Sequence, residues 1–505
     1  MSMAAAALPE NSAAAPGGRG VFWLSVAIVA TIKLHVLLSS AGDVLGDYAR
    51  LVALADDMLR SSRWLFEGDI DKYALPPAIW KTPGYPLLIA GSKLLLGENW
   101  PWGLGILQSV MSFVAGLFVR RFALALGFGP KAAALAFVMY AFSVPASTDT
   151  LIMPDGFYGS IATMVIAALG IRFLGGRVLP LRAALGAGLA LMACFWVREG
   201  FAFLVVPFGL ALVAPFWLGG MAMRSAVFLL AVFCAPALFS TGVVMVWNKY
   251  RTGDYLVAIV SQTVYLLTVL KVAEKVPGVF DGDTPLDRVA RTITLKDHDY
   301  GDAQAIDEVL FRDYGIKAPE LMRLAQAKYW QTVARFPGTF ALTMWERLRF
   351  RQQASMLGDV LMRLDDLDWW RFVGPQKPYM AGWRADAQKF IDTRDFKYLS
   401  GAVVVNAAPR IVLRGVTLVL FVLFTFALPL IVMRDFWVAK NPDAARQAIL
   451  FGSLYLLYWG IIFIYMLVSL EIRYLGPICV IPIVGSLWSC GRIASLMPPL
   501  RLSKA

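Results

Sequence analysis

The stretch Ser225–Trp247 reads SAVFLLAVFCAPALFSTGVVMVW and contains no charged residue. It is longer than the about 20 apolar residues that an α-helix needs to cross the hydrocarbon layer of a membrane. The whole chain shares this bias, because 58% of its 505 residues are hydrophobic and only 16% are charged, against about 25% charged residues in a soluble domain. The sequence therefore predicts an all-α polytopic membrane protein, and it excludes a disordered protein, a collagen and a disulfide-stapled secreted domain.

Further apolar runs bring the prediction to about ten transmembrane helices. The runs lie at about residues 21–40, 102–119, 132–147, 156–174, 183–197, 200–218, 225–247, 409–433, 447–469 and 474–491. Another stretch, Pro83–Gly97, is short for a crossing and contains two prolines and Lys93. If this stretch stays at the surface, nearly all Lys and Arg residues of the short loops fall on one side, as the positive-inside rule requires. We therefore predict that Pro83–Gly97 lies in the interface, and that the net charge of +12 reflects topology rather than nucleic-acid binding.

The predicted spans divide the chain into five segments. They are a disordered cytoplasmic tail (1–20), a transmembrane module (21–247) with its first outer loop at 41–101, an outer-face, periplasmic segment (248–408), the C-terminal transmembrane helices (409–492) and a cytoplasmic tail (493–505). Within the outer-face segment we expect a small helical cap over 281–314 and a helix in the membrane interface over 336–352.

The first outer loop begins with the sequence GDYARLVALADDML at residues 46–59. Its apolar residues have helical spacing, which predicts an amphipathic helix at the membrane interface. Asp47 and Arg50 are three residues apart and can share a face of this helix. The alternative is that Asp47 only caps the helix and that Arg50 is a solvated charge.

Other ionisable residues are predicted to emerge at the same outer face. Together with the first loop they come from five segments: Asp47, Lys81, Asp155, Arg198 and Arg473. Charges near the membrane are energetically costly, so they are functional candidates by default. Carboxylates beside several cations suit a reaction that needs a base and stabilises an anionic leaving group. For Arg198 and its neighbour Glu199, an interhelical salt bridge or a snorkelling arginine is the alternative.

The order and spacing of these motifs resemble the GT-C superfamily of membrane glycosyltransferases, and most closely the protein O-mannosyltransferases and the bacterial lipid A aminoarabinose transferase. Those proteins open their first outer loop with Asp-Glu-x-Arg-Tyr and an Ala-x-x-Met-Leu helix. Here Asp47 and Arg50 match the first motif, with Tyr48 in place of the Glu and Leu51 in place of the Tyr. The helix motif is matched by Ala55, Met58 and Leu59.

Later motifs extend the resemblance along the chain. The run KTPGYPL at residues 81–87 resembles the family's Lys/Arg-x-Pro-x-Tyr-Pro-Leu run, and Trp102–Arg121 is similar to the span that follows it. Met153–Asp155 resembles an acidic turn between spans, and the sequence EIRYLGP at residues 471–477 resembles an Arg-Tyr-x-x-Pro entry to a late span. The resemblance covers residues 21–220 and 460–490 and is weak across 250–405.

This resemblance implies that a sugar is transferred, with inversion, from a polyprenyl-phosphate donor to an acceptor hydroxyl at the outer face. The implied location is a bacterial inner membrane, with the active site facing the periplasm. Asp47 would be the general base, and Asp155 would orient the acceptor or the base. The donor phosphate would contact the remaining residues, with Tyr474 in a supporting role: Arg50, Lys81, Arg198, Arg473 and Tyr474. The other implied partners are a glycan, lipid or protein acceptor and the lipid bilayer, and no nucleic acid.

We expect no cofactor and no metal ligand set. The four cysteines have no CxxC spacing, and there are only two histidines. A divalent cation stays open, because some relatives use acidic pairs and the Glu after Asp47 is missing here.

Two other functions stay open from the sequence. A transporter or flippase of an anionic lipid-linked sugar would also need many spans and charges, although paired broken spans are not evident. A non-catalytic assembly subunit would use Asp47 only as a helix cap. Tryptophans of the outer segment would stack on sugar rings or, in the reading we favour, anchor the interface: Trp330, Trp345, Trp369, Trp370 and Trp383.

Overall fold

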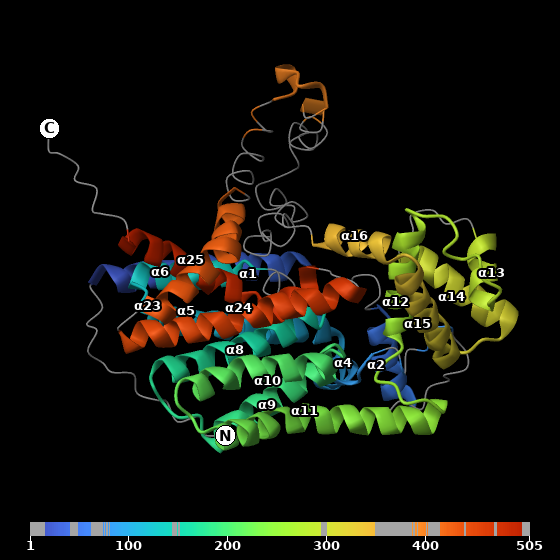
Figure 1. Ribbon diagram of the computed structural model, residues 1–505, viewed down its shortest axis with the longest axis horizontal. Helices are drawn as coiled ribbons and strands as arrows, with labels where there is room; N and C mark the ends of the chain where they lie inside the picture. Colours follow the sequence, from blue (N-terminus) through green and yellow to red (C-terminus); the bar gives the residue numbers. More distant parts are fainter. Residues whose placement is uncertain are drawn as a thin grey trace.

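A computed structural model describes most of the chain. The described residues are 16–40, 49–61, 74, 76, 79, 81–143, 149, 152–293, 300–348, 386, 389–390, 392–399, 401, 404, 415–438, 441–468 and 472–496. Within these ranges all regular secondary structure is helical, which confirms the predicted all-α class. Figure 1 shows a bundle of long helices with a smaller group of helices at one end.

The bundle contains a helix for each of the ten predicted runs. These are α1 (Pro16–Ser40), α5 (Trp100–Ala125), α6 (Pro130–Ala141), α8 (Asp155–Leu174), α9 (Leu181–Val197), α10 (Phe201–Leu218), α11 (Met223–Thr252), the helix Gly415–Val438 that ends in α23 (Leu428–Val438), α24 (Pro442–Val468) and α25 (Val480–Leu496). Among the described residues, six helical segments are long and apolar enough to cross a membrane. They are Gly84–Ala125, Asp155–Leu174, Phe201–Leu218, Met223–Thr252, Gly415–Val438 and Pro442–Leu467. The polytopic class therefore stands, although α6, α9 and α25 are shorter apolar helices.

Several helices begin or end a few residues away from the approximate predicted boundaries. The last run begins as a 3-10 helix over Ile472–Ile478, and the α-helix α25 starts only at Val480. Pro477 lies in this 3-10 helix, and a proline has no N–H for an α-helical hydrogen bond. At the other end of the chain, α1 begins at Pro16 inside the predicted tail, since proline is well suited to the first position of a helix. At the C-terminal end, α25 continues to Leu496 and so extends past residue 493, where the tail was predicted to begin.

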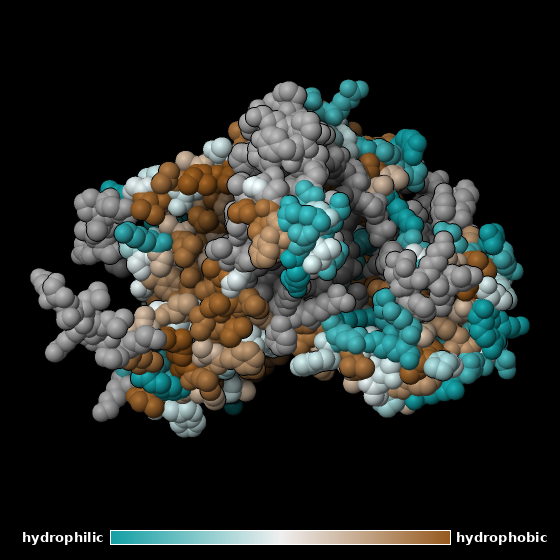
Figure 2. Space-filling model, turned by 90° about the horizontal axis from the view of Figure 1, so that it is seen from above, coloured by the Kyte–Doolittle hydropathy of each residue, from teal (hydrophilic) through white to brown (hydrophobic). Residues whose placement is uncertain are grey.

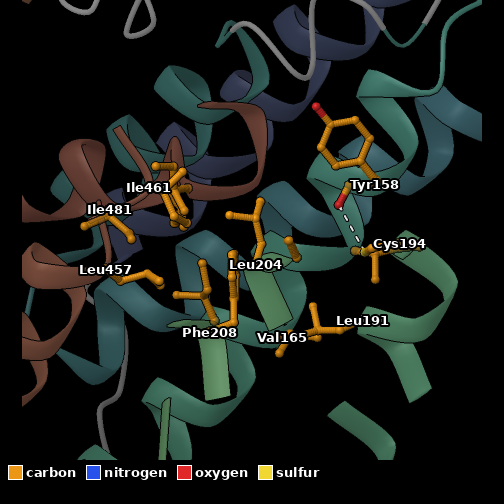
Figure 3. Close-up of a cluster of buried hydrophobic side chains, with 14 of the residues drawn as sticks. Tyr158, Val165, Leu191, Cys194, Leu204, Phe208, Leu457, Ile461 and Ile481 are labelled. Atoms are coloured by element: carbon orange, nitrogen blue, oxygen red, sulfur yellow. Dashed lines mark hydrogen bonds between the residues drawn. The ribbon is translucent and has the colours of Figure 1, made fainter. Parts of the chain in front are cut away.

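Close contacts between helices hold the bundle together. A Cβ added at Gly188 of α9 would lie 2.2 Å from the carbonyl oxygen of Phe233 in α11, so only glycine allows this approach. Figure 3 shows part of the core, to which α8, α10 and α24 contribute Val165, Leu204 and Leu457. Figure 2 shows many apolar side chains on the surface of one face of the bundle. On α11, Phe239 is 74% exposed. Such a surface is suited to a lipid environment.

Two short helices lie across one end of the bundle. The helix α2 (Ala49–Ser61) buries Leu51, Leu54, Ala55 and Met58, which confirms the predicted amphipathic helix. It packs on α4 (Gly84–Leu96), which begins beside Trp196 at the end of α9 and ends beside Gly103 at the start of α5. Both ends of α4 therefore lie at the same end of the bundle, as expected of a helix that does not cross. We call this end, where α8 and α10 begin and α9 and α11 end, the site end.

The smaller group of helices forms a domain at the site end, on the right in Figure 1. It consists of α12 (Val260–Ala273), α13 (Pro285–Thr292), α14 (Tyr300–Tyr314), α15 (Ala318–Arg335) and α16 (Pro337–Arg347). These helices enclose a hydrophobic core of their own, which includes Leu270, Val289 and Leu321. Within the predicted cap, 281–314, α13 and α14 are helical, and α16 lies within the predicted helix at 336–352.

Two polar contacts join this domain to the last turn of α24. Tyr329 donates a hydrogen bond of 2.6 Å to the carbonyl oxygen of Leu467, and Arg347 Nη1 donates one of 3.3 Å to that of Met466. Burial raises the pKa of Tyr329 to about 12 and lowers the pKa of Arg347 to about 10. Both groups therefore keep their donor protons at neutral pH, and Arg347 brings positive charge to the negative end of the helix dipole.

Candidate functional site

A buried ion pair between α8 and α9 lies at the centre of the candidate site. Asp155 is the first residue of α8, and Arg198 follows the last residue of α9. Arg198 Nη1 lies 3.0 Å and 3.2 Å from the two carboxylate oxygens of Asp155, and the hydroxyl of Tyr158 donates a hydrogen bond of 3.1 Å to one of them. Asp155 is 1% exposed and Arg198 is 6% exposed. The N-terminus of α8 also favours the negative charge of Asp155.

An aromatic side chain covers the guanidinium of this pair. The ring centre of Tyr474 lies 4.7 Å from Arg198 Cζ, within the range of a cation–π contact. Tyr474 belongs to the 3-10 turn Ile472–Ile478 and packs against Tyr465 of α24, with 5.2 Å between the ring centres. The late Arg-Tyr motif of the sequence is thus brought to the pair between α8 and α9.

A second ion pair involves Glu199, the residue that follows Arg198 in the chain. Lys81 Nζ is 3.6 Å from a carboxylate oxygen of Glu199, and both side chains are largely buried. Lys81 precedes α4, and Gly84 brings α4 close to α9, because a Cβ at Gly84 would lie 2.5 Å from the carbonyl oxygen of Trp196. Within the described residues, the other carboxylate oxygen of Glu199 is buried and has no hydrogen-bond partner. Glu199 therefore remains an acceptor that a ligand hydroxyl could use.

The structure brings some of the predicted site residues together and leaves others undecided. Lys81, Asp155, Arg198 and Tyr474 gather at the site end, while Arg50 is half-buried on α2, the helix that packs on α4. Asp47 and the side chain of Arg473 lie outside the described residues, so their roles stay predictions. Arg198 does not pair with its neighbour Glu199. It makes the interhelical salt bridge that was the alternative to phosphate binding.

Sequence reasoning missed a polar network inside the bundle. Lys33 of α1 pairs with Asp149 and lies 3.0 Å from Ser112 Oγ of α5. Gln108 of α5 donates a hydrogen bond of 3.1 Å to the backbone carbonyl of Asp149 and accepts one of 3.1 Å from the Tyr85 hydroxyl of α4. The network ties α1, α4 and α5 to the segment before Asp155. A lysine within an apolar run was the signal that could have found it.

The described part of the site contains two buried cations, Lys81 and Arg198, and each is paired with a carboxylate. Buried cations in a poorly solvated site interact more strongly with a phosphate than they would in water. The described part of the chain contains no group of three or more His, Cys, Asp or Glu side chains that could hold a metal ion.

Comparison with known proteins gives little beyond these observations. No protein-family model matches the chain, and no curated protein matches it. Among solved structures, the chain is similar to the crystal structure of ArnT from Cupriavidus metallidurans in the apo state. The two share 15% sequence identity, and the match covers 96% of this chain and 82% of that one with a TM-score of 0.33. A likeness of this degree carries no functional argument.

Proposed function

We propose that this protein is an integral-membrane glycosyltransferase of the GT-C type. It moves a sugar from a polyprenyl-phosphate donor to an acceptor hydroxyl, at the outer face of a bacterial inner membrane, with inversion at the anomeric carbon. The acceptor is a glycan, a lipid or a protein. The sequence motifs that resemble GT-C enzymes support this function, and so does the geometry of the candidate site.

One observation carries the proposal. Two buried ion pairs and a covering tyrosine gather at the site end from chain segments that are far apart in sequence: Lys81, Asp155, Arg198, Glu199 and Tyr474. A polar cluster at the end of an apolar bundle lies where a lipid-linked donor would present its phosphate while its tail stays in the bilayer. A midplane site would favour transport instead.

The proposed step is a single displacement. The acceptor oxygen forms a bond to the anomeric carbon, and the bond from that carbon to the phosphate oxygen breaks. The acceptor proton goes to Asp47, acting as general base. The leaving phosphate gains negative charge, which Lys81, Arg50 and Arg473 stabilise. Asp155 holds Arg198 and, through it, Tyr474 in place.

A transfer assay with a radiolabelled polyprenyl-phosphate sugar tests this function. Asp47→Asn should abolish transfer while membrane insertion stays normal, because an amide cannot accept the acceptor proton. Asp57→Asn on α2 is the matched control, since Asp57 is exposed, and it should transfer like the wild type. Retained transfer in Asp47→Asn would refute the assignment of the base. Chelation with EDTA should leave turnover unchanged, and a loss restored by Mg²⁺ or Mn²⁺ would show a metal requirement.

A transporter or flippase of an anionic lipid-linked sugar is the second candidate. The buried pair of Lys33 and Asp149 favours it, because charged groups inside a bundle are typical of transport pathways. The same labelled donor, enclosed in vesicles with the purified protein, separates the two functions. Movement of label across the bilayer without transfer would support transport, and transfer without movement would support the enzyme.

A further inference from the structure

A groove opens at the end of the bundle that is opposite to the candidate site. Its volume is about 470 Å³, and it lies between the turn that joins α8 to α9 and the first turns of α11. It is lined by Val178, Leu179, Met221, Arg224, Ser225, Phe228 and Leu229. The helix α8, with 20 residues, separates this end from Asp155 by about 30 Å, which is about the thickness of the hydrocarbon layer. The groove and the candidate site thus lie at opposite membrane surfaces.

The walls of the groove are apolar and open to the outside. Val178 is 73% exposed and Phe228 is 58% exposed. Both side chains therefore present apolar surface at the mouth of the groove. The shape and chemistry of the walls therefore fit a hydrocarbon chain.

Arginines line the rim of the groove. Arg224 and Ser225 line it, and Arg177 and Arg182 are exposed on either side of Val178 and Leu179 in the chain. Arg172 fixes the turn by donating a hydrogen bond of 2.7 Å to the carbonyl oxygen of Val178. Neither segment 171–182 nor segment 219–229 contains Asp or Glu. The rim is therefore complementary to an anion.

Two helix ends add to this positive potential. Both α9 and α11 begin at the groove, after Pro180 and Ala222, and neither helix has a side chain that caps its first N–H groups. Uncapped N–H groups at a helix N-terminus attract negative charge. An anion at the rim would find arginines, a serine hydroxyl and these dipoles together.

We propose that this groove binds an anionic phospholipid of the leaflet opposite to the candidate site. The phosphate lies between Arg224 and Arg177, and one acyl chain runs along Val178 and Phe228. A free phosphate ion would use the rim but would leave the apolar walls uncovered, so the walls favour a lipid. The binding does not depend on the proposed transfer reaction.

Native mass spectrometry of the full-length protein, released from nanodiscs of phosphatidylethanolamine and phosphatidylglycerol, tests the proposal. The wild type should retain phosphatidylglycerol in preference to phosphatidylethanolamine. The double variant Arg177→Gln/Arg224→Gln should retain about 30-fold less phosphatidylglycerol, as the loss of two surface cations implies. Lys131→Gln is the matched control, because Lys131 is an exposed cation at the same end of the bundle but outside the groove. It should retain lipid like the wild type.

Three results would overturn the proposal. They are equal retention of the two lipids by the wild type, unchanged retention in the double variant, and displacement of the bound lipid by inorganic phosphate alone. The substituted arginines are exposed, so the variants should fold, and their melting temperatures check this. If the double variant is unstable, the single variant Arg224→Gln decides the same question.

Discussion

The small helical domain and the candidate site each contain a buried carboxylate paired with a cation, and the two pairs are built differently. In the domain, Asp287 of α13 pairs with Lys328 of α15, and both side chains are buried. The backbone N–H of Asp287 donates to Thr284 Oγ1, whose hydroxyl donates a hydrogen bond of 2.7 Å back to the Asp287 carboxylate. Lys328 also lies 3.1 Å from an oxygen of Gln331. This pair closes a helix cap and joins two helices.

The site pair has the same burial but different surroundings. Asp155 and Asp287 are each 1% exposed, so burial does not distinguish them. Beside Asp155 and Arg198, however, lie a second ion pair and the ring of Tyr474. The comparison teaches that a buried ion pair by itself indicates structure. Several polar groups buried together, in addition to such a pair, indicate a functional role.

The largest expected effect on transfer comes from replacing both residues of the buried ion pair at the site, compared with replacing both residues of the pair in the domain. Replacing both partners of a buried ion pair with neutral residues is often close to neutral for stability. Asp155→Asn/Arg198→Met should therefore stay folded but lose transfer by about 10³-fold, since organised charge is lost from the site. Asp287→Asn/Lys328→Met should transfer like the wild type. Transfer rates and circular dichroism of both double variants check this, and equal losses in the two would remove the distinction.

Replacing one residue of the ion pair in the domain should reduce the stability of the protein and leave its transfer rate unchanged. Lys328→Met leaves Asp287 buried and unpaired, and should lower the free energy of unfolding of the domain by about 3 kcal/mol. Denaturant unfolding in detergent measures the change, and transfer below the unfolding transition should be normal. Lys397→Met, which removes the cation of an exposed ion pair, is the control and should change stability by about 1 kcal/mol at most. A change of that size in Lys328→Met would contradict the structural role.

A methyl group at Gly84 tests the position of Lys81 without changing any charge. Gly84→Ala must push α4 away from Trp196 and so move Lys81 relative to Glu199. Since small displacements in an active site have large effects, transfer should fall by about 10-fold while the protein stays folded. Gly91→Ala on the same helix is the matched control, because nothing lies within 4 Å of its added Cβ. Equal activities of the two variants would show that the position of Lys81 is not critical.

The smallest expected effect concerns the ring over Arg198. Tyr474→Leu removes a cation–π contact of about 1 kcal/mol, so the apparent affinity for the donor should weaken by about 5-fold. Tyr255→Leu is the control, because the Tyr255 ring contacts Lys249 at 5.3 Å outside the site and is 63% exposed. Donor titrations measure both variants. A loss confined to the maximal rate, with donor affinity unchanged, would speak against this role of Tyr474.

Much of the fold followed from local sequence patterns. Apolar runs predicted the helices of the bundle, because a helix satisfies its own backbone hydrogen bonds and needs only length and hydropathy to suit a membrane. The spacing of Leu51, Leu54, Ala55 and Met58 predicted α2 for the same local reason. The start of α25 was misplaced, since hydropathy does not report how Pro477 ends an α-helical hydrogen-bond pattern.

The candidate site was predicted only in part. The motifs singled out Lys81, Asp155, Arg198 and Tyr474, which the structure does bring together. They could not assign partners, because Arg198 and Glu199 are neighbours in the chain but pair with different segments. Lys33 was overlooked because its carboxylate partner is far away in sequence.

The sequence by itself determined the class of protein, the approximate positions of its apolar helices and the residue types that a membrane protein would not keep without a reason. These properties depend on composition and on the period of a single helix. Only the tertiary structure decided which charges meet, and that a basic groove opens at the end of the bundle opposite to the candidate site. Such contacts join segments distant along the chain, and their energies depend on distances that no local pattern contains.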